Sequence, residues 1–191
     1  KACKDEKIMR SKKYFGILDF DGVLLSTDYK RICMELGIPL DGFSNQESIE
    51  KEPIKFLEYV APFLKGREVD KVARKIAEHS EYIEGWELLM RFYKNGCDFI
   101  IVTNNPLADL ILKEKGYEKL GEKLYKTTEL KRKGNIFTGE VERIGRKIDY
   151  IKGYLDEAEQ ILLVTDNNTE EERTLPNLLK KLGYSVKVRV I

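Results

Sequence analysis

Residues 14–25 read Tyr14-Phe-Gly-Ile-Leu-Asp19-Phe-Asp21-Gly-Val-Leu-Leu25, a short apolar run that ends in two aspartates one residue apart. Side chains alternate between the two faces of a strand, so the two acids and Phe20 cannot all be accommodated unless the strand stops here. We therefore predict a buried strand whose carboxyl end delivers both acids into a crevice. Two carboxylates this close repel each other unless a cation lies between them, and Mg²⁺ is a hard cation that takes oxygen ligands.

Three more apolar, β-rich runs follow, at Phe99–Val102, Ile161–Val164 and Val186–Ile191. Segments with helical periodicity separate these runs. Their apolar faces begin at Trp86, Leu107, Ile148 and Leu175. Strands that alternate with helices are joined by parallel crossovers. We therefore predict an α/β fold with a doubly wound (Rossmann-like) parallel sheet.

Two regions interrupt this alternation. Residues 28–85 contain no convincing strand and carry apolar residues at helical spacing, so we predict a small helical cap inserted after the first strand. The expected division is a discontinuous α/β core (1–27 and 86–191) with a cap (28–85). In the second region, Lys123–Leu130 and Ile136–Ile144 flank a lysine-glycine-asparagine turn, which indicates a β-hairpin.

The composition excludes several classes of function. The 191 residues carry 34 basic and 33 acidic side chains, and a net charge of +1 argues against nucleic acid as a partner. His79 is the single histidine, and the three cysteines form no Cys-x-x-Cys, so zinc sites and His-based triads lack their residues. No apolar run approaches the roughly 20 residues of a membrane span.

The location and assembly of the protein are less constrained by the sequence. Residues 1–13 are basic but lack the apolar core of a signal peptide, so we expect a loose leader on a cytoplasmic protein. The sequence leaves the oligomeric state open.

Polar residues follow each apolar run at the point where the strand is expected to end. Thr103 and Asn104 follow the second run, and Asp166 follows the third, with Glu170 one helical turn further on. In open parallel sheets, ligands bind outside the carboxyl ends of the strands. These residues are therefore expected at the same rim as Asp19 and Asp21.

A cation for a phosphate group is expected at the same rim. Lys147 falls in the first turn of the helix that precedes the third run. Lys152 lies about 7 Å further along that helix and is expected to point away from the rim. Lys147 is therefore the preferred phosphate-binding lysine, and Lys152 is the alternative.

The set of residues and its order resemble the haloacid dehalogenase superfamily, whose members are mostly phosphatases. Asp19-x-Asp21-Gly-Val-Leu24 matches the first motif, Thr103 the second, Lys147 the third, and Asp166 with Glu170 the fourth. The resemblance extends from Tyr14 to about Leu179. Within the superfamily, the helical insertion resembles a C1-type cap, and the predicted hairpin resembles that of the phosphoserine-phosphatase branch.

This resemblance implies a reaction through an aspartyl-phosphate. Asp19 is expected to attack phosphorus as the nucleophile, and Asp21 to protonate the leaving oxygen and then activate water. Asp19, the backbone carbonyl of Asp21, and Asp166 are the expected ligands of Mg²⁺.

The remaining motif residues are expected to bind the phosphate group and to support the metal site. Thr103, Lys147 and the backbone amide near Asn104 are expected to neutralise phosphate oxygens. Glu170 is expected to order the magnesium shell or to brace Lys147.

The sequence departs from the family pattern at several places, including the loop after the second motif, where Asn104-Asn105-Pro106 stand in place of the usual small glycines. The fourth motif opens with Thr165 where glycine is usual, and Glu170 stands where aspartate is usual. Asp28 occupies the place of the substrate-binding acid of the phosphoserine branch, with a shorter side chain. The branch also has a cap arginine, and Glu47–Tyr59 offer none in a matching context. A free amino-acid carboxylate would lack its partner, so phosphoserine is not the expected substrate.

The leading hypothesis is a Mg²⁺-dependent hydrolase that acts on a small phosphorylated metabolite. The alternatives are a phosphotransferase or mutase, a receiver-like module that is phosphorylated as a signal, and a non-catalytic phosphate-binding relative. The sequence also allows purely structural roles for some of these residues. Thr103 and Asp166 could each cap a helix, and Lys147 could lie on a solvated helix face.

Overall fold

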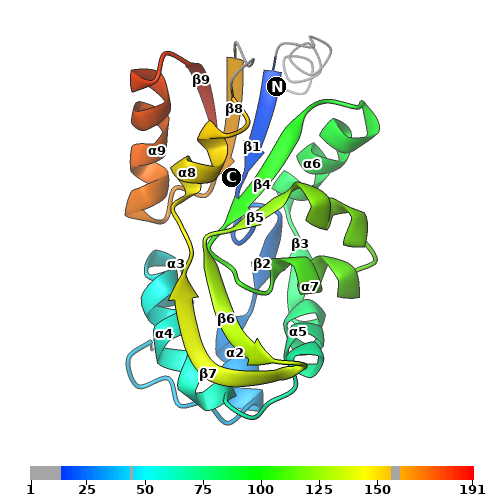
Figure 1. Cartoon of the computed structure of the whole chain (residues 1–191), viewed down its shortest axis with the longest axis vertical. Coiled ribbons are helices and arrows are strands. Elements are labelled where there is room, and N and C mark those ends of the chain that lie inside the picture. Colours follow the sequence, from blue (N-terminus) through cyan, green and yellow to red (C-terminus); the bar gives the residue numbers. More distant parts are fainter. Residues whose placement is uncertain (1–13, 44, 156–159) are drawn as a thin grey trace.

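The computed structural model describes residues 14–43, 45–155 and 160–191, so the basic segment 1–13 and Cys3 lie outside the described residues. A parallel sheet of five strands forms the core, and helices cover both of its faces (Figure 1). The predicted α/β, doubly wound class is therefore confirmed. In spatial order the strands are β5 (Leu124–Lys126), β4 (Phe99–Thr103), β1 (Tyr14–Leu18), β8 (Gln160–Thr165) and β9 (Ser185–Val190).

Alternation of side chains along the strands divides the core between two layers of helices. Ile17 packs with α8 (Lys147–Lys152) and α9 (Glu170–Lys181), whereas its neighbour Leu18 belongs to the cluster on the opposite face. That opposite face is covered by α6 (Glu84–Lys94), α7 (Ala108–Glu114) and the 3₁₀ helix η1 (Glu118–Lys123). Both faces of the central strands are apolar because both are covered.

The order of the strands places a switch point beside β1. Along the chain, the next strand of this sheet after β1 is β4, which pairs with one side of β1. The later strand β8 pairs with the other side. Connections therefore leave the centre of the sheet in opposite directions and open a crevice at the carboxyl ends of β1 and β8.

Four helices extend beyond this crevice (Figure 1). They are α2 (Tyr29–Glu35), α3 (Gln46–Lys51), α4 (Pro53–Leu64) and α5 (Val69–Glu78). Two short antiparallel strands, β2 (Leu25–Thr27) and β3 (Ser80–Tyr82), join this helical region to the core. The expectation that residues 28–85 contain no strand is therefore wrong at β3, which is too short to show an alternating pattern. The division into a core and a cap at residues 28 and 85 stays a prediction, and below we call the α2–α5 region the cap.

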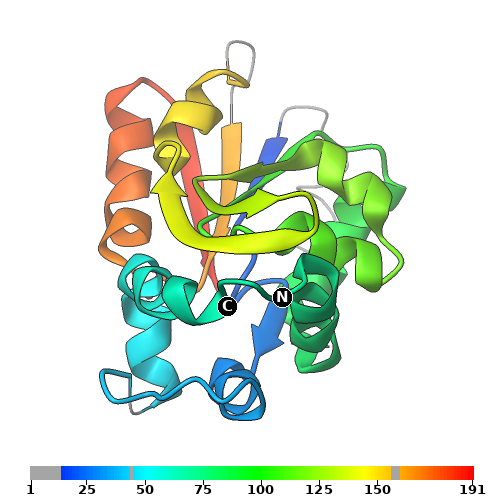
Figure 2. The same cartoon turned by 60° about the horizontal axis from the view of Figure 1, so that its bottom comes forward.

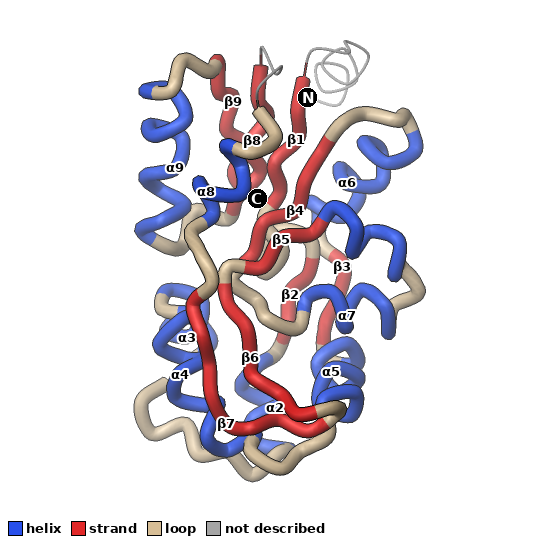
Figure 3. The backbone as a smooth tube through the Cα atoms, in the orientation of Figure 1, coloured by secondary structure: helices blue, strands red, loops and turns tan. Residues whose placement is uncertain are grey.

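The hairpin consists of β6 (Thr128–Lys133) and β7 (Ile136–Arg143) and runs along the cap helices (Figures 2 and 3). Its first arm is shorter than predicted, because Leu124–Lys126 pair with β4 in the main sheet as β5. At the turn, backbone hydrogen bonds join Phe137 to Gly66 and Arg67, at 2.9 and 3.0 Å. The hairpin therefore contacts the cap as well as the core.

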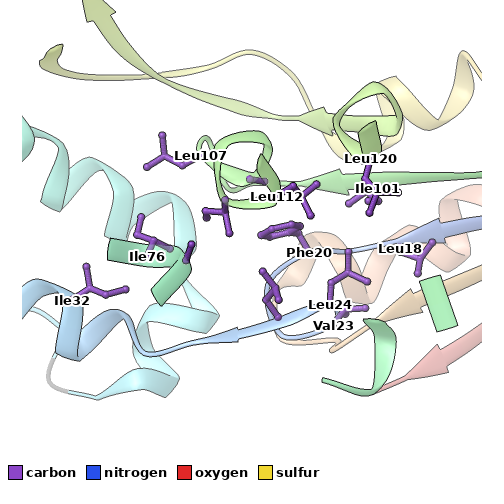
Figure 4. Close-up of a cluster of buried hydrophobic side chains, with 14 of the residues drawn as sticks. Leu18, Phe20, Val23, Leu24, Ile32, Ile76, Ile101, Leu107, Leu112 and Leu120 are labelled. Atoms are coloured by element: carbon purple, nitrogen blue, oxygen red, sulfur yellow. The ribbon is translucent and has the colours of Figure 1, made fainter. Parts of the chain in front are cut away.

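One apolar cluster runs without a break from the sheet into the cap (Figure 4). Phe20 and Leu24 lie at its centre, and Ile32 and Ile76 extend it into the cap helices. In the described part of the chain, no helix is long and apolar enough to cross a membrane.

Candidate active site

The turn after β1 places Phe20 in the apolar core and the flanking acids, Asp19 and Asp21, at a cavity. Phe20 is fully buried in the apolar cluster, while Asp19 and Asp21 line a cavity at the end of the strand. The Phe20 carbonyl accepts hydrogen bonds from the amides of Leu24 and Leu25, at 2.9 and 3.2 Å, and so closes the turn. The amide of Phe20 donates to Oδ1 of Asp19, at 2.8 Å, which fixes the orientation of that carboxylate.

Lys147 connects two buried carboxylates. Its ammonium lies 2.8 Å from Oδ2 of Asp19 and 2.8 Å from Oε1 of Glu172, and its side chain is only 3% exposed. Burial alone disfavours the charged form of the lysine, but the two carboxylates outweigh it and raise the pKa of Lys147. The alternative that Lys147 lies on a solvated helix face is therefore wrong, whereas Lys152 is exposed.

Asp166 faces the first turn from the end of β8. Its Oδ1 accepts from the amide of Asn168 at 3.0 Å, and its Oδ2 from the Asn168 carboxamide at 2.8 Å. A Cβ at Gly22 would lie 2.1 Å from Oδ2 of Asp166, and the φ of Gly22 is +72°, so a glycine is needed for this approach. Burial, together with the nearby Glu172, raises the pKa of Asp166 to about 7.

Glu172, rather than the predicted Glu170, is the glutamate that braces Lys147. Glu170 is exposed at the start of α9, whereas Glu172 is 4% exposed and faces the acids. Thr169 caps the helix and forms a capping box with Glu172, so the proposed capping role of Asp166 is also wrong. The pattern Thr169-x-x-Glu172 is a capping-box signature that is readable in the sequence.

The two glutamates provide a matched pair for a test. We expect Glu172→Gln to lower Mg²⁺ affinity or turnover about 10–100-fold, because it weakens the group that orients Lys147 beside Asp19. Glu170→Gln, two positions away on the same helix, is expected to change either quantity less than about twofold. Calorimetric titration with Mg²⁺ and a phosphatase assay measure both effects, and equal effects of the two substitutions would contradict the assignment.

Asp21 is held by two residues, Tyr29 and Asn105, whose contact with it the sequence did not predict. The Tyr29 hydroxyl donates to Oδ1 of Asp21 at 2.7 Å, and the Asn105 carboxamide donates to Oδ2 at 3.0 Å. Burial raises the pKa of Asp21, and these two hydrogen bonds oppose the rise. No sequence signal marks Tyr29 or Asn105, because helix α2 and the loop after β4 meet only in the folded chain.

Thr103 and Asn104 lie at the end of β4, as predicted, and both line the cavity. Oγ1 of Thr103 accepts from the amide of Asn105 at 3.0 Å, which leaves its hydroxyl proton to donate to a ligand. Thr103 does not cap α7, whose first residue follows Leu107. The side-chain oxygen and the carbonyl of Asn104 accept hydrogen bonds from Thr127 and Thr128 and so attach the hairpin to this loop.

Asp28 does not join the site. It is exposed, caps α2 by accepting from the amide of Arg31 at 3.0 Å, and is not among the residues that line the cavity. The residue after it, Tyr29, enters the cavity instead. The substrate-binding place that the family resemblance gives to Asp28 is therefore not supported by its position.

The donor set fits a divalent cation. Asp19, Asp166 and Glu172 each offer a carboxylate oxygen, and these oxygens lie within 4.8 Å of one another. With Asp21, four acidic side chains face Lys147, more than one ammonium can balance when all of them are ionised. The hydrogen bonds of the described chain also leave the backbone carbonyl of Asp21 without a donor. Carboxylate and carbonyl oxygens are the ligands that Mg²⁺ takes.

Several solved structures of phosphoserine phosphatases and of a related protein have a fold similar to that of this chain. A phospho-aspartyl intermediate analogue of phosphoserine phosphatase is 21% identical, with a TM-score of 0.58 over 90% of this chain and 84% of that one. A substrate-bound phosphoserine phosphatase complex gives 20% identity and a TM-score of 0.57, over 90% and 84% of the two chains. A phosphoserine phosphohydrolase-like protein from Francisella tularensis subsp. tularensis SCHU S4 gives 14% and 0.54, over 93% and 86%.

Comparison of the sequence with protein-family models and with curated proteins gives no match. At these levels of identity the structural neighbours show that the chain shares its fold with phosphoserine phosphatases.

Proposed function

We propose that this protein is a Mg²⁺-dependent phosphomonoester hydrolase that acts on a small phosphorylated metabolite through an aspartyl-phosphate. The observation that carries the proposal is the pairing of Asp19 with Lys147 at 2.8 Å, with Asp166 and Asp21 at the same end of the sheet. The shared fold with phosphoserine phosphatases supports it. The cytoplasmic location predicted from the sequence stays a prediction.

The reaction is a double displacement. A carboxylate oxygen of Asp19 attacks phosphorus, the bond from phosphorus to the ester oxygen breaks, and Asp21 protonates the departing alcohol. Asp21, now a carboxylate, removes a proton from a water molecule that attacks the phosphorus of the aspartyl-phosphate. The acyl-phosphate bond breaks, which restores Asp19 and releases inorganic phosphate.

The surrounding residues have roles that follow from their positions. Thr103 donates its hydroxyl to a phosphate oxygen, and the Lys147 ammonium neutralises charge beside Asp19. Tyr29 and Asn105 hold Asp21 in place for both proton transfers. Asp19, Asp166 and the carbonyl of Asp21 would hold Mg²⁺, with Glu172 beside them. The chemistry that Mg²⁺ supplies there is neutralisation of charge on the phosphoryl oxygens.

The test is hydrolysis of a generic aryl phosphate with Mg²⁺ and with EDTA. We expect release of inorganic phosphate that depends on Mg²⁺, because a bound cation would offset the repulsion between a phosphate dianion and the acidic side chains around it. Product analysis with added alcohols as acceptors separates hydrolysis from phosphotransfer. A chain that binds Mg²⁺ and beryllofluoride but releases no phosphate from any monoester would be a non-catalytic relative, and the proposal would be wrong.

A further inference from the structure

The cavity between the acids and the cap has two dissimilar ends. Its volume is about 120 Å³. One end is formed by the catalytic acids, Lys147 and the loop after β4. Most of the other wall comes from apolar side chains of the cap, chiefly Ile32, Ile49, Phe56, Leu57, Val60 and Ile76.

The apolar end has no positive charge to offer a ligand. Among the residues that line the cavity, all of them in the described ranges, only Lys147 has a cationic side chain, and Asp19 and Glu172 already pair with it. The one charged side chain that the cap contributes is the carboxylate of Glu50, which accepts a hydrogen bond from Gln46 at 3.1 Å. An anionic substituent on a substrate would meet this carboxylate and no cation.

The arginines of the cap are committed elsewhere. Arg31 pairs with Glu35 at 3.1 Å, and Arg74 with Glu114 at 3.3 Å. Arg67 donates to the backbone carbonyls of Phe63 and Leu36, at 2.9 and 2.7 Å. None of the three lines the cavity. A carboxylate in the apolar end would therefore lose its hydration without gaining a partner, which is costly.

We propose, on the basis of the phosphatase function above, that the substrate is a phosphate monoester of a compact, uncharged, apolar alcohol. A cavity of about 150 Å³ lined by aliphatic and aromatic side chains holds a molecule of the size of benzene. The volume of about 120 Å³ includes the end that holds the phosphate group, so the body of the alcohol is smaller than benzene and has at most about four carbon atoms. Apolar contacts with the cap supply the binding energy that holds the ester oxygen beside Asp21. Phosphoserine, with its carboxylate, is excluded.

Alkyl phosphates test this proposal without a change in the chemistry of the leaving group. We expect kcat/KM to rise about fourfold for each of the three methylenes added from methyl to n-butyl phosphate, or about 60-fold over the series. O-phosphoserine is expected to react at least about 100-fold less efficiently than n-propyl phosphate. Equal kcat/KM values for all the alkyl phosphates, or a higher value for phosphoserine, would overturn the inference about the substrate. Hydrolysis of these esters would still support the proposed phosphatase function.

Binding of phosphonates separates the two proposals when turnover is absent. Calorimetry with Mg²⁺ present is expected to show tighter binding of n-butylphosphonate than of methylphosphonate, and no saturable binding of 2-amino-4-phosphonobutanoate. This order supports the cavity assignment even in a chain that hydrolyses nothing. Equal affinities, or preferred binding of the amino acid, would overturn it.

A pair of substitutions on α4 identifies the wall responsible. Leu57→Lys places a cation in the apolar end, and we expect it to lower kcat/KM for n-butyl phosphate at least tenfold and to reduce the selectivity over phosphoserine. Glu58 is the next residue, is exposed and does not line the cavity. Glu58→Lys is expected to leave the selectivity unchanged, and an equal loss of selectivity in both variants would assign it to general surface charge.

Discussion

Asp19→Asn is expected to abolish phosphatase turnover, with a fall in kcat of at least about 10³-fold. The carboxamide oxygen still accepts from the amide of Phe20, so the turn keeps its shape, but the side chain no longer attacks phosphorus. Steady-state hydrolysis of an aryl phosphate measures the loss. Acid quenching with labelled substrate is expected to trap a phosphoprotein from the wild type and none from the variant.

The control for this substitution is Asp28→Asn. Asp28 is exposed and caps α2, and asparagine caps helices as well as aspartate does. Its kcat is expected to stay within about twofold of the wild type. Substantial turnover by the Asp19→Asn variant would refute the nucleophile assignment, and a large loss in Asp28→Asn would return that residue to the site.

Lys147→Met is expected to lower both the free energy of unfolding and kcat. Removing one partner from a buried ion pair leaves uncompensated charge and costs about 3–5 kcal/mol in the free energy of unfolding. Here the ammonium serves two carboxylates, Asp19 and Glu172, at 2.8 Å each. We expect a loss of that size in urea unfolding with EDTA present. We also expect kcat to fall at least about 100-fold, because the oxyanion loses a neutralising donor.

Lys152→Met separates these effects from the general loss of a lysine. Lys152 lies on the same helix but is exposed. Its replacement is expected to change the free energy of unfolding by less than about 0.5 kcal/mol and to leave kcat unchanged. Similar losses in both variants would show that the helix, and not the buried ammonium, is responsible.

The strands that the sequence predicts are those long enough to give a recognisable run of apolar residues. β1, β4 and β8 are buried on both faces, so their sequences are continuous apolar stretches followed by polar residues. Because a strand end fixes where the next side chain lies, the positions of Asp19, Thr103 and Asp166 follow from the sequence. In contrast, β2, β3 and β5 have three residues each, too few for a pattern.

The part of the site that could not be predicted depends on local geometry and on packing. The prediction of Glu170 assumed a helix starting soon after Asp166, but Asn167 adopts a left-handed conformation with a φ of 62°, and the helix begins only at Glu170. Glu172 therefore occupies the third helical position and faces Lys147. Tyr29 meets Asn105 across 76 positions of sequence, a contact that no local pattern encodes.

The hairpin has a mechanical consequence for access to the buried cavity. At one end, hydrogen bonds from Thr127 and Thr128 fasten it to Asn104, the neighbour of Thr103. At the other, it is bonded to the backbone of the cap at Arg67 and Val69. A cap joined to the core only through β2 and β3 could rotate about those two strands. The hairpin joins the cap to the core at a second place, so such a rotation would have to bend the hairpin. Any movement of the cap is therefore passed through the hairpin to the loop that carries Thr103 and Asn104.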